Sequence, residues 1–526
     1  MESPYKERYE ALLEWAHENG ASLHPSIEIY QDEKTGFSLR VKPSATEPLH
    51  SPFKAVTCPT SITLSYLNAL TDGPITPPSP TTTAAAPVHV PNTTPHKQKP
   101  AFPERFMTAL PPHVIGRFYL IQQYLKGPSS FWAPYIATLP DPSGQLDKWA
   151  LPPFWTQDDI ELLRGTNAYV AIGEIQENVK SEYKLARKVL KQEGYADYRA
   201  YTQVLYNWAY CMFTSRSFRP SLILEGSVRG WVEEKLLLPA AEARGGVKVK
   251  VDDFSILQPL YDIGNHSPEA KYSWNLTQEP EPSACELVCL DSYKPGEQVF
   301  NNYGSKTNSE LLLGYGFVTE GNDYVHVRKR QQPGGSTQNE GGVGGGEPQD
   351  FLISRQSYWA PGSSAIKSRM GEDFTPNLLH YRFSHWDGRM LDDMVGMMAS
   401  PRQLELVKAL PTTDLASDGD GNGGVESFGE ELDQLMHMLT ATLAQKTERD
   451  FVEFVAGEPN GGEEWEPVTE RQALVKRYRG GYEKVFENVL REFGYTDDEI
   501  AELKAAALEM DGEEEEEEDH EMEDGN

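Results

Sequence analysis

Cysteine is scarce in this chain of 526 residues, and the few thiols present are scattered. The four positions are Cys58, Cys211, Cys285 and Cys289. So small a number excludes the disulfide framework of a small secreted domain. Cys285 and Cys289 lie four residues apart, but no second Cys/His pair stands nearby to complete a zinc site, so we expect no metal. We interpret these cysteines as small core residues in or near strands.

Long hydrophobic runs are also missing. No stretch of about 18 apolar residues occurs, so we expect no membrane-spanning helix and no membrane partner. The start of the chain, Met1–Pro4, has neither the basic nor the apolar region of a secretory signal peptide. Together these absences predict a soluble, reduced, intracellular protein, located in the cytoplasm, the nucleus or both.

Basic residues are in deficit. The chain has 48 Lys and Arg against 80 Asp and Glu, a formal net charge of −32. A phosphate backbone needs a basic footprint, so we expect no direct nucleic-acid binding. The acidity either attracts a basic protein partner over long range or serves solubility. Residues 511–526 hold eleven acidic side chains and no Lys or Arg, and they form either a docking element or an unstructured solvated run.

The periodicity of apolar residues changes along the chain and predicts an α+β organisation. The expected helices cover residues 3–19, much of 101–215 and most of the chain beyond 350. The expected strands cover 38–41, 53–57, 285–290 and the alternating Val/Lys segment 247–252. An apolar stripe between Leu474 and Phe493 is interpreted as core packing or as a partner face.

Three short polar motifs follow the apolar segment Phe254–Leu260. They are Asp262–Ser267 (Asp-Ile-Gly-Asn-His-Ser), Asn302–Ser305 (Asn-Tyr-Gly-Ser) and Leu313–Phe317 (Leu-Gly-Tyr-Gly-Phe). Taken singly, the Asn and His are more often satisfied structural residues than ligands, and the Tyr-Gly steps are ambiguous because Tyr before Gly is common at strand ends. Their combination with Ser215–Phe218 (Ser-Arg-Ser-Phe) is more informative.

This combination resembles the SET-domain methyltransferases, and within them the branch typified by the RuBisCO large-subunit lysine methyltransferase. Leu13–Trp15 with Asn19–Ala21 and His24–Pro25 resembles the opening helix and turn of that family, and Ser305–Leu312 resembles the helix between its two Tyr-Gly steps. The resemblance implies an α+β, β-rich SET fold with a pseudoknot. A helical insert would interrupt this fold, and an all-α C-terminal domain would follow it.

Combined with the low-complexity stretches, the resemblance predicts a domain order. Residues 71–100 are rich in Pro, Thr and Ala, and residues 331–349 are rich in Gly, so both are interpreted as linkers or surface insertions. The predicted segments are 1–70 (N-terminal helix and first part of the SET fold), 71–100 (linker), 101–210 (helical insert), 211–330 (SET core with cofactor and catalytic motifs), 331–349 (linker), 350–508 (helical substrate-binding-like domain) and 509–526 (acidic disordered tail).

The resemblance also implies S-adenosyl-L-methionine as cofactor and assigns the site residues. Tyr315 aligns with the catalytic tyrosine of the family. The implied cofactor-binding residues are Gly36, Ser38, Arg216, Asn265, His266, Tyr303 and Phe317, and the implied substrate-binding residues are Asp262, Trp274 and Tyr324. One departure is visible, because Ser38 stands where the family usually has the second Gly of a Gly-x-Gly. A Cβ at this position could narrow the site.

The implied activity is protein-lysine N-methylation of a non-histone protein, with a basic ribosomal protein as candidate substrate and a monomeric enzyme. Tyr315 favours lysine over histidine, since the histidine-directed relative does not keep that tyrosine. The alternative is a non-catalytic SET-fold scaffold, such as an acidic assembly factor or chaperone. Cofactor binding would distinguish the two.

Overall fold

The computed structural model describes residues 4–77, 99–144, 149–277, 283–328, 350–357, 360, 374–410, 429–462 and 465–509. The chain divides into two compact units. The first unit comprises Met1–Phe154 and Ile175–Gly304, and the second comprises Trp155–Glu174 and Ser305–Asn526. Residues 155–174 of the predicted insert and residues 305–330 of the predicted SET core therefore group with the C-terminal part of the chain.

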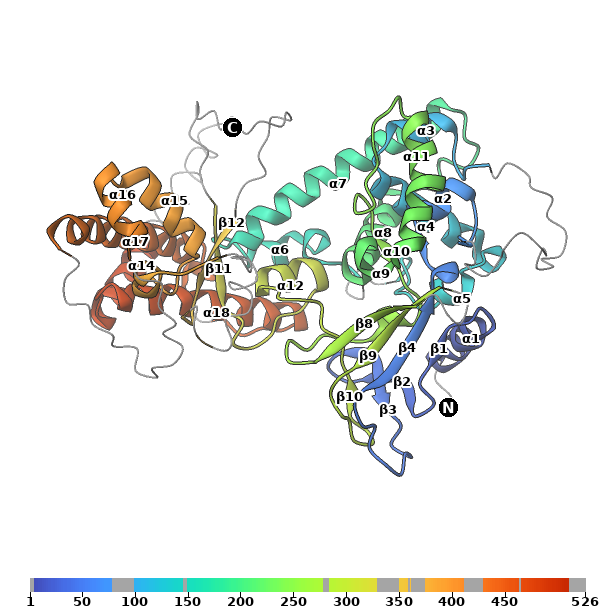
Figure 1. The fold of residues 1–526 in the computed structure, drawn as a ribbon, viewed down its shortest axis with the longest axis horizontal. Helices are drawn as coiled ribbons and strands as arrows, with labels where there is room; N and C mark the ends of the chain where they lie inside the picture. The colour runs from blue at the N-terminus through green and yellow to red at the C-terminus, as the bar shows by residue number, and fades with distance from the viewer. Residues whose placement is uncertain are drawn as a thin grey trace, which may run out of the picture. The chain divides into compact units, whose positions relative to one another are not determined.

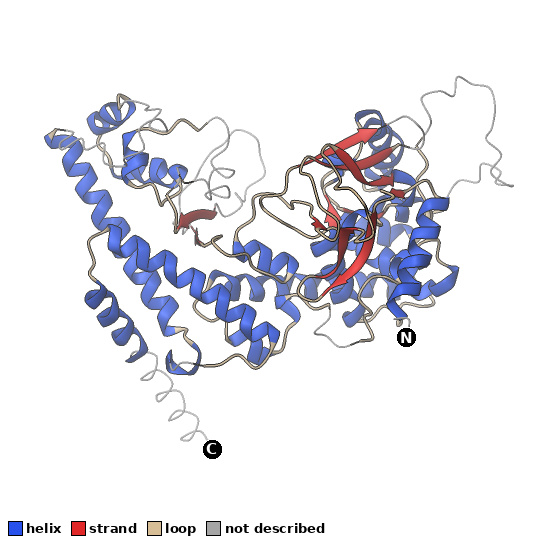
Figure 2. Ribbon diagram, turned by 90° about the horizontal axis from the view of Figure 1, so that it is seen from below, coloured by secondary structure: helices blue, strands red, loops and turns tan. Residues whose placement is uncertain are grey.

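Three antiparallel sheets form the β-structure described in the first unit (Figures 1 and 2). The sheets have the orders β1-β4-β9-β8 (Ser22–Leu23, Phe53–Pro59, Ala284–Cys289, Tyr272–Thr277), β10-β3-β2 (Gln298–Val299, Gly36–Val41, Ile27–Asp32) and β5-β7-β6 (Leu64–Ser65, Ile256–Leu257, Ser217–Phe218). Strand β9 is buried at every position, so it lies inside the core rather than at a wet sheet surface. Cys58 and Cys285 face each other across β4 and β9, and all four cysteines are free and buried.

The first unit also contains helices. They are α1 (Pro4–Glu18), α2 (Tyr66–Thr71), α3 (Glu104–Ala109), α4 (Pro112–Lys126), α5 (Ala133–Ile136), α8 (Gln203–Arg216), α9 (Pro220–Ile223), α10 (Gly226–Val232) and α11 (Leu238–Ala243), together with most of α7 (Asn167–Gln192). Helix α4 starts with Pro112, which suits a first helical position because its missing N–H would be unpaired there anyway. It is apolar around most of its circumference and packs against α2 and α8, so it forms the centre of the helical insert.

The second unit is mainly helical. Its elements are α6 (Gln157–Glu161), α12 (Asn308–Tyr315), the paired strands β11 and β12 (Tyr324–Arg328, Asp350–Ser354), α14 (Leu378–Arg382), α15 (Gly388–Met398), α16 (Pro401–Lys408), α17 (Glu430–Ala456) and α18 (Glu470–Glu492). The stripe on α18 is buried at Leu474, Tyr478, Tyr482, Val485 and Val489, so it is core packing.

Two glycines explain why residues 155–174 belong to the second unit. A Cβ on Gly165 would lie 2.7 Å from the carbonyl oxygen of Phe454, and one on Gly457 would lie 2.6 Å from the carbonyl carbon of Arg164. Only residues without side chains allow this approach. Arg479, which is 4% exposed, donates hydrogen bonds to the carbonyls of Arg164 and Phe454 and so closes the same junction.

Most sequence-based expectations for single elements are confirmed, namely α1, β3, β4, β9 and the helices of the insert. The strand expected at 247–252 is wrong. Val247 is 61% exposed and follows Gly245 and Gly246, both with positive φ, and residues 247–250 have no regular structure. The alternating Val/Lys segment has no neighbouring strand to pair with among the described residues, so it does not form a strand. Of the apolar segment 254–260, only Ile256–Leu257 is a strand.

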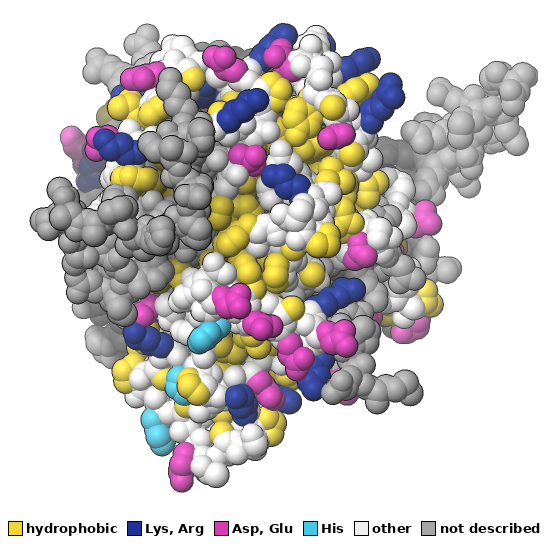
Figure 3. Space-filling model, turned by 90° about the vertical axis from the view of Figure 1, so that its right-hand side faces the viewer, with side chains coloured by type: hydrophobic (Ala, Val, Ile, Leu, Met, Phe, Trp, Pro, Cys, Tyr) yellow, Lys and Arg dark blue, Asp and Glu magenta, His cyan; other side chains and the backbone are white. Residues whose placement is uncertain are grey.

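Several predictions fall partly or wholly outside the described residues. They concern the Pro/Thr-rich linker, the Gly-rich linker and the acidic tail. Within the described residues, no helix combines the length and the apolarity needed to cross a membrane. On the face that Figure 3 displays, hydrophobic side chains lie among charged side chains of both signs. The net negative charge of the chain therefore does not make this face uniformly acidic.

Candidate active site

The Asn-His motif begins at a strained backbone position. Leu260 has φ +68°, a conformation that bulky residues rarely adopt and that tends to occur at functional sites. A single 3₁₀ turn over Tyr261–Ile263 follows. This turn buries the side chain of Asp262, which is 2% exposed, and leaves Asn265 and His266 half-buried at its end.

The first Tyr-Gly step lies beside this motif. The backbone N–H of Asn301 donates to the carbonyl of Asn265 (2.8 Å), and the N–H of Tyr303 donates to Nδ1 of His266 (3.0 Å). The rings of His266 and Tyr303 stack with centroids 5.1 Å apart, and the Tyr303 hydroxyl donates to the carbonyl of Gly264 (3.0 Å). Two motifs separated in sequence therefore share one site. Because Nδ1 of His266 accepts a hydrogen bond, its neutral ring carries the proton on Nε2.

Arg216 and Asp262 form the charged part of the site. Arg216, the last residue of α8, places Nη1 3.6 Å from Oδ2 of Asp262, and the Tyr135 hydroxyl donates to the same oxygen (2.8 Å). The other oxygen, Oδ1, is buried and has no hydrogen-bond partner in the described structure. Burial raises the pKa of Asp262, and Arg216 and Tyr135 offset only part of that rise. Burial, reinforced by the Asp262 charge, also raises the pKa of nearby Tyr9 to about 12.

Ser38 faces the same region. It is fully buried on β3, and its hydroxyl donates to Oε1 of Gln298 (2.9 Å), the oxygen that also accepts from Nδ2 of Asn265 (3.1 Å). The departure from Gly-x-Gly therefore adds a polar link to Asn265. Gly36 begins the same strand with φ +72°, a conformation that favours glycine.

Trp274 lies in an aromatic cluster on β8. Its ring contacts Phe218, Tyr261 and Tyr272 at centroid distances of 5.6, 6.3 and 5.6 Å, and its buried indole N–H has no hydrogen-bond partner in the described part of the chain. A buried, unpaired N–H is costly unless a ligand or water completes it. The substrate-binding role expected for Trp274 stays a prediction.

The second unit holds the other predicted site residues. Tyr315 ends α12, and Gly316 closes the helix in the left-handed region at φ +78°, which requires glycine there. The rings of Tyr315 and Phe317 lie 6.2 Å apart, and burial together with the charge of Glu310 raises the pKa of Tyr315. Tyr324 is 3% exposed at the start of β11. The functional roles of these residues stay predictions.

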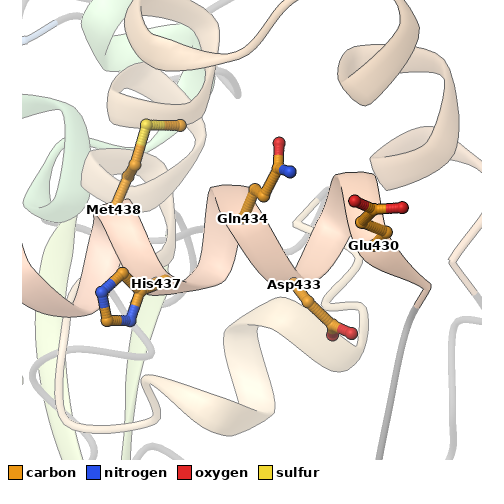
Figure 4. A pocket seen from close by; sticks show the side chains of 5 residues that line it. All are labelled: Glu430, Asp433, Gln434, His437 and Met438. Atoms are coloured by element: carbon orange, nitrogen blue, oxygen red, sulfur yellow. The ribbon is translucent and has the colours of Figure 1, made fainter.

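A separate depression on the second unit carries no such chemistry. Its lining residues all come from α17: Glu430, Asp433, Gln434, His437 and Met438 (Figure 4). They follow one exposed helix face and spread along it without converging on a common point. Among the described residues, no group of three or more His, Cys, Asp or Glu is arranged to hold a metal.

No family model matches the chain. Over 320 residues it is 28% identical to the ribosomal lysine N-methyltransferase set10 of Schizosaccharomyces pombe, covering 60% of this chain and 47% of the relative. Over 324 residues it is 24% identical to the actin-histidine N-methyltransferase of Homo sapiens, covering 60% and 43%. The matched region thus spans less than half the length of these relatives.

Solved structures decide the fold. The SET domain of LSMT bound to MeLysine and AdoHcy matches with a TM-score of 0.54 at 16% identity, covering 95% of this chain and 93% of that one. Rubisco LSMT bound to Sinefungin and Monomethyllysine matches with a TM-score of 0.52 at 16% identity, over 95% and 93% of the two chains. The chain has the SET fold. The resemblance to the LSMT-like branch and the α+β fold class are therefore confirmed.

Within the SET fold, the first unit brings together Arg216, Asp262, Asn265, His266, Tyr303 and Ser38. Sequence reasoning missed Tyr135, Gln298 and Asn301, which complete the same cluster. Tyr135 carried no signal beyond an aromatic segment in the insert. Gln298 follows a turn four residues after Lys294, a position that looks like an ordinary strand start.

Proposed function

We propose that the protein is an S-adenosyl-L-methionine-dependent protein-lysine N-methyltransferase. The observation that carries the proposal is the cluster of Asn265, His266 and Tyr303 with the Arg216–Asp262 pair, in which Oδ1 of Asp262 is buried and has no hydrogen-bond partner among the described residues. Buried polar atoms are normally satisfied, so an open carboxylate oxygen suggests a ligand. The SET fold and two curated relatives named as protein methyltransferases support the same activity.

The residues of the first unit fit the proposed cofactor. Its amino-acid end carries an ammonium and a carboxylate, and the cluster offers an acceptor oxygen on Asn265 and the guanidinium of Arg216, whose side chain is 30% exposed. When bound, the cofactor supplies an activated methyl group on its sulfonium. Asn265, His266 and Arg216 would hold it, and the protein contributes positioning and exclusion of water.

The remaining requirement is a neutral lysine amine. A lysine with its ordinary pKa of about 10.4 pays roughly 4.6 kcal/mol to be neutral at pH 7. Buried surroundings lower that cost because they disfavour the ammonium form. We assign Asp262 of the first unit to accept a hydrogen bond from the substrate amine through Oδ1. Tyr315 of the second unit is proposed separately, from the family resemblance, as the catalytic tyrosine. Burial and the charge of Glu310 raise the pKa of Tyr315, so its hydroxyl stays protonated.

The substrate proposed here is a basic, non-histone protein, with a ribosomal protein as the specific candidate. Two observations support it: the net charge of −32, which favours encounter with basic proteins, and the relative named as a ribosomal lysine methyltransferase. Lysine is preferred over histidine because Tyr315 is present. We further propose a monomeric enzyme of the cytoplasm, the nucleus or both.

Transfer of a labelled methyl group tests the activity. The protein is incubated with labelled S-adenosyl-L-methionine and ribosomal proteins, with Tyr315→Phe as the matched variant. We expect a labelled band that weakens strongly in the variant and labelled lysine after hydrolysis. Labelled histidine would overturn the lysine assignment.

The non-catalytic scaffold makes the opposite prediction for the cofactor. Calorimetry with S-adenosylhomocysteine is expected to show binding by the wild-type chain. No binding, and no labelled band with any basic protein fraction, would favour the scaffold and contradict the enzyme.

A further inference from the structure

Gln298, the first residue of β10, lies at the centre of a hydrogen-bond network that the proposed function does not use. Its Oε1 accepts from Oγ of Ser38 (2.9 Å) and Nδ2 of Asn265 (3.1 Å). Its Nε2 donates to the hydroxyl of Tyr30 (2.8 Å). One glutamine amide thus connects a cofactor-site asparagine with side chains from β2 and β3.

The sheet β10-β3-β2 explains this convergence. Tyr30 and Ser38 are directly opposite each other in the β2–β3 pair, and Gln298 is opposite Arg40, two positions from Ser38. Residues two apart on a strand share a face, so Tyr30, Ser38 and Gln298 project to the same side of the sheet. The register of three short strands therefore builds the network.

The direction of every hydrogen bond in the network follows from Asp32. Its carboxylate can only accept, so the Tyr30 hydroxyl donates to Oδ2 of Asp32 (3.2 Å). Backbone N–H groups of Lys34 and Thr35 donate to Oδ1 at 2.9 Å each, and these bonds lower the pKa of Asp32 and keep it ionised. The oxygen of Tyr30 then accepts from Nε2 of Gln298, which turns Oε1 of Gln298 towards Asn265.

The orientation of the Asn265 amide is fixed as a result. Its Nδ2 donates to Gln298 and to the backbone carbonyl of Thr35 (3.3 Å), two groups that accept here. Both amide hydrogens are then used. Oδ1 of Asn265 has no protein partner among the described residues, so a ligand at Asn265 meets an acceptor oxygen and not a donor nitrogen.

We propose that Gln298 is a positioning residue that holds the Asn265 amide with its oxygen presented to the amine of the bound cofactor. The inference rests on the proposed function, because it takes Asn265 as a cofactor ligand. Without the Oε1 acceptor, the Asn265 amide loses one of its two anchors and can turn its NH₂ group to the site. An NH₂ group repels an ammonium, so recognition of the amine weakens specifically.

Ser38 supports the same arrangement. Its hydroxyl supplies a second donor to Oε1 of Gln298 and opposes rotation of the glutamine amide. Replacement of Ser38 by Ala removes one donor but leaves Oε1 in place. Its effect is expected in the same direction as loss of Gln298, and smaller.

The test compares two ligands that differ only at the amine. Binding of S-adenosylhomocysteine and of its deaminated analogue, which keeps the carboxylate, is measured by calorimetry on the full chain. For Gln298→Leu we expect about tenfold weaker binding of S-adenosylhomocysteine, the range for a hydrogen bond to a charged group. The analogue should change less than about twofold, since its binding does not use the amine contact.

Gln298→Glu is the comparison variant, because it keeps an acceptor oxygen for Ser38 and Asn265 and loses the Nε2 donor to Tyr30. In this variant, the ratio of the affinities for S-adenosylhomocysteine and its deaminated analogue should stay within about threefold of the wild-type ratio. If Gln298→Leu does not fold, Ser38→Ala and Tyr30→Phe are measured instead. Each should reduce the affinity for S-adenosylhomocysteine relative to its deaminated analogue, by less than is expected for Gln298→Leu. Thermal unfolding confirms that each variant is folded.

Three outcomes are distinguishable. Selective loss for S-adenosylhomocysteine with rescue in Gln298→Glu supports the positioning role. Equal loss for both ligands, or no loss in a folded Gln298→Leu, overturns it and leaves the proposed function intact. Absence of binding by the wild-type chain overturns the proposed function, and the role of Gln298 with it.

Discussion

Glu182 and Asp262 are two buried or half-buried carboxylates of the first unit with opposite surroundings. Glu182, on α7 in the helical insert, is satisfied at both oxygens. Its Oε1 lies 2.8 Å from Nε2 of His113, and its Oε2 accepts from Arg117 (2.6 Å) and Tyr206 (2.8 Å). Burial alone would raise the pKa of Glu182, but these partners outweigh it and the pKa is lowered.

Asp262 is more deeply buried and less well partnered. Only Oδ2 is bonded, by Tyr135, with Arg216 nearby, and Oδ1 has no partner within the described residues. The effect of burial is larger than that of these partners, so the pKa of Asp262 is raised. Asp262 is buried more deeply than Glu182 and has fewer hydrogen-bond partners, and both differences act to raise its pKa relative to that of Glu182.

The contrast separates a carboxylate that is fully paired within the fold from one for which we propose a function. A carboxylate whose two oxygens are both paired holds the fold together, and changing it costs stability. A buried carboxylate with an open oxygen costs the fold something and is explained by a ligand.

The largest effect is expected from Asp262→Asn. Tyr135 and Arg216 are donors beside Oδ2, so an Asn amide would keep its oxygen there and place its NH₂ group where Oδ1 is assigned to accept from the substrate amine. Labelled methyl transfer should therefore fall about 100-fold, the cost of a misplaced reacting group. Asp197→Asn, an exposed aspartate of the same unit, is the control and should keep full activity. Wild-type activity in a folded Asp262→Asn would remove Asp262 from the site.

Glu182→Gln tests whether the paired carboxylate stabilises the fold. Arg117 is 13% exposed, and leaving it without a full counter-charge is expected to cost about 2 kcal/mol of unfolding free energy, less than for a fully buried pair. Urea denaturation measures the loss. Binding of S-adenosylhomocysteine by the folded variant should be unchanged, and Glu177→Gln, exposed on the same helix, should unfold like wild type. A loss of binding would show that Glu182 serves the site.

The contacts around Asp262 show what sequence patterns can and cannot predict. Helix α1 and strands β3, β4 and β9 follow local periodicity, and the order of the polar motifs leads to Asn265 and Tyr303 in one cluster. These features depend on neighbours in sequence or on motifs with fixed order. They were therefore open to prediction.

Contacts made by distant residues were not predictable in the same way. Tyr135 lies 127 residues from Asp262, and Ser38 lies 260 residues from Gln298. Their meeting depends on how the insert packs and on the register of β10, β3 and β2, neither of which a local pattern contains. The wrong prediction of a strand at 247–252 has the same cause. Alternating residues favour a strand, but the strand forms only where a neighbouring strand pairs with it, and that neighbour cannot be read from the local sequence.

Tyr135→Phe should have a smaller effect than either carboxylate change. It deletes the hydroxyl that donates to Asp262 and leaves the ring in place, so activity is expected to fall about tenfold, as for one hydrogen bond to a charged group. Tyr119→Phe is the matched control, since Tyr119 is fully buried and its hydroxyl has no partner in the described structure. It should keep wild-type activity. Equal effects of the two changes would argue against the role of Tyr135.

The smallest expected effect is a difference in pH dependence, and it has opposite signs for the two carboxylates. The pKa of Glu182 is lowered in the folded state, so its stabilisation is present above the ordinary carboxyl pKa and is lost as the pH falls through the folded value. The destabilisation in Glu182→Gln should therefore shrink on acidification.

The pKa of Asp262 is raised, so ionisation of this carboxyl destabilises the folded state as the pH rises from the ordinary carboxyl pKa through the folded-state pKa. The stability of Asp262→Asn relative to wild type should therefore improve across that same rise. Urea denaturation at several pH values checks both slopes, and slopes of equal sign would contradict the distinction between a paired and an open carboxylate.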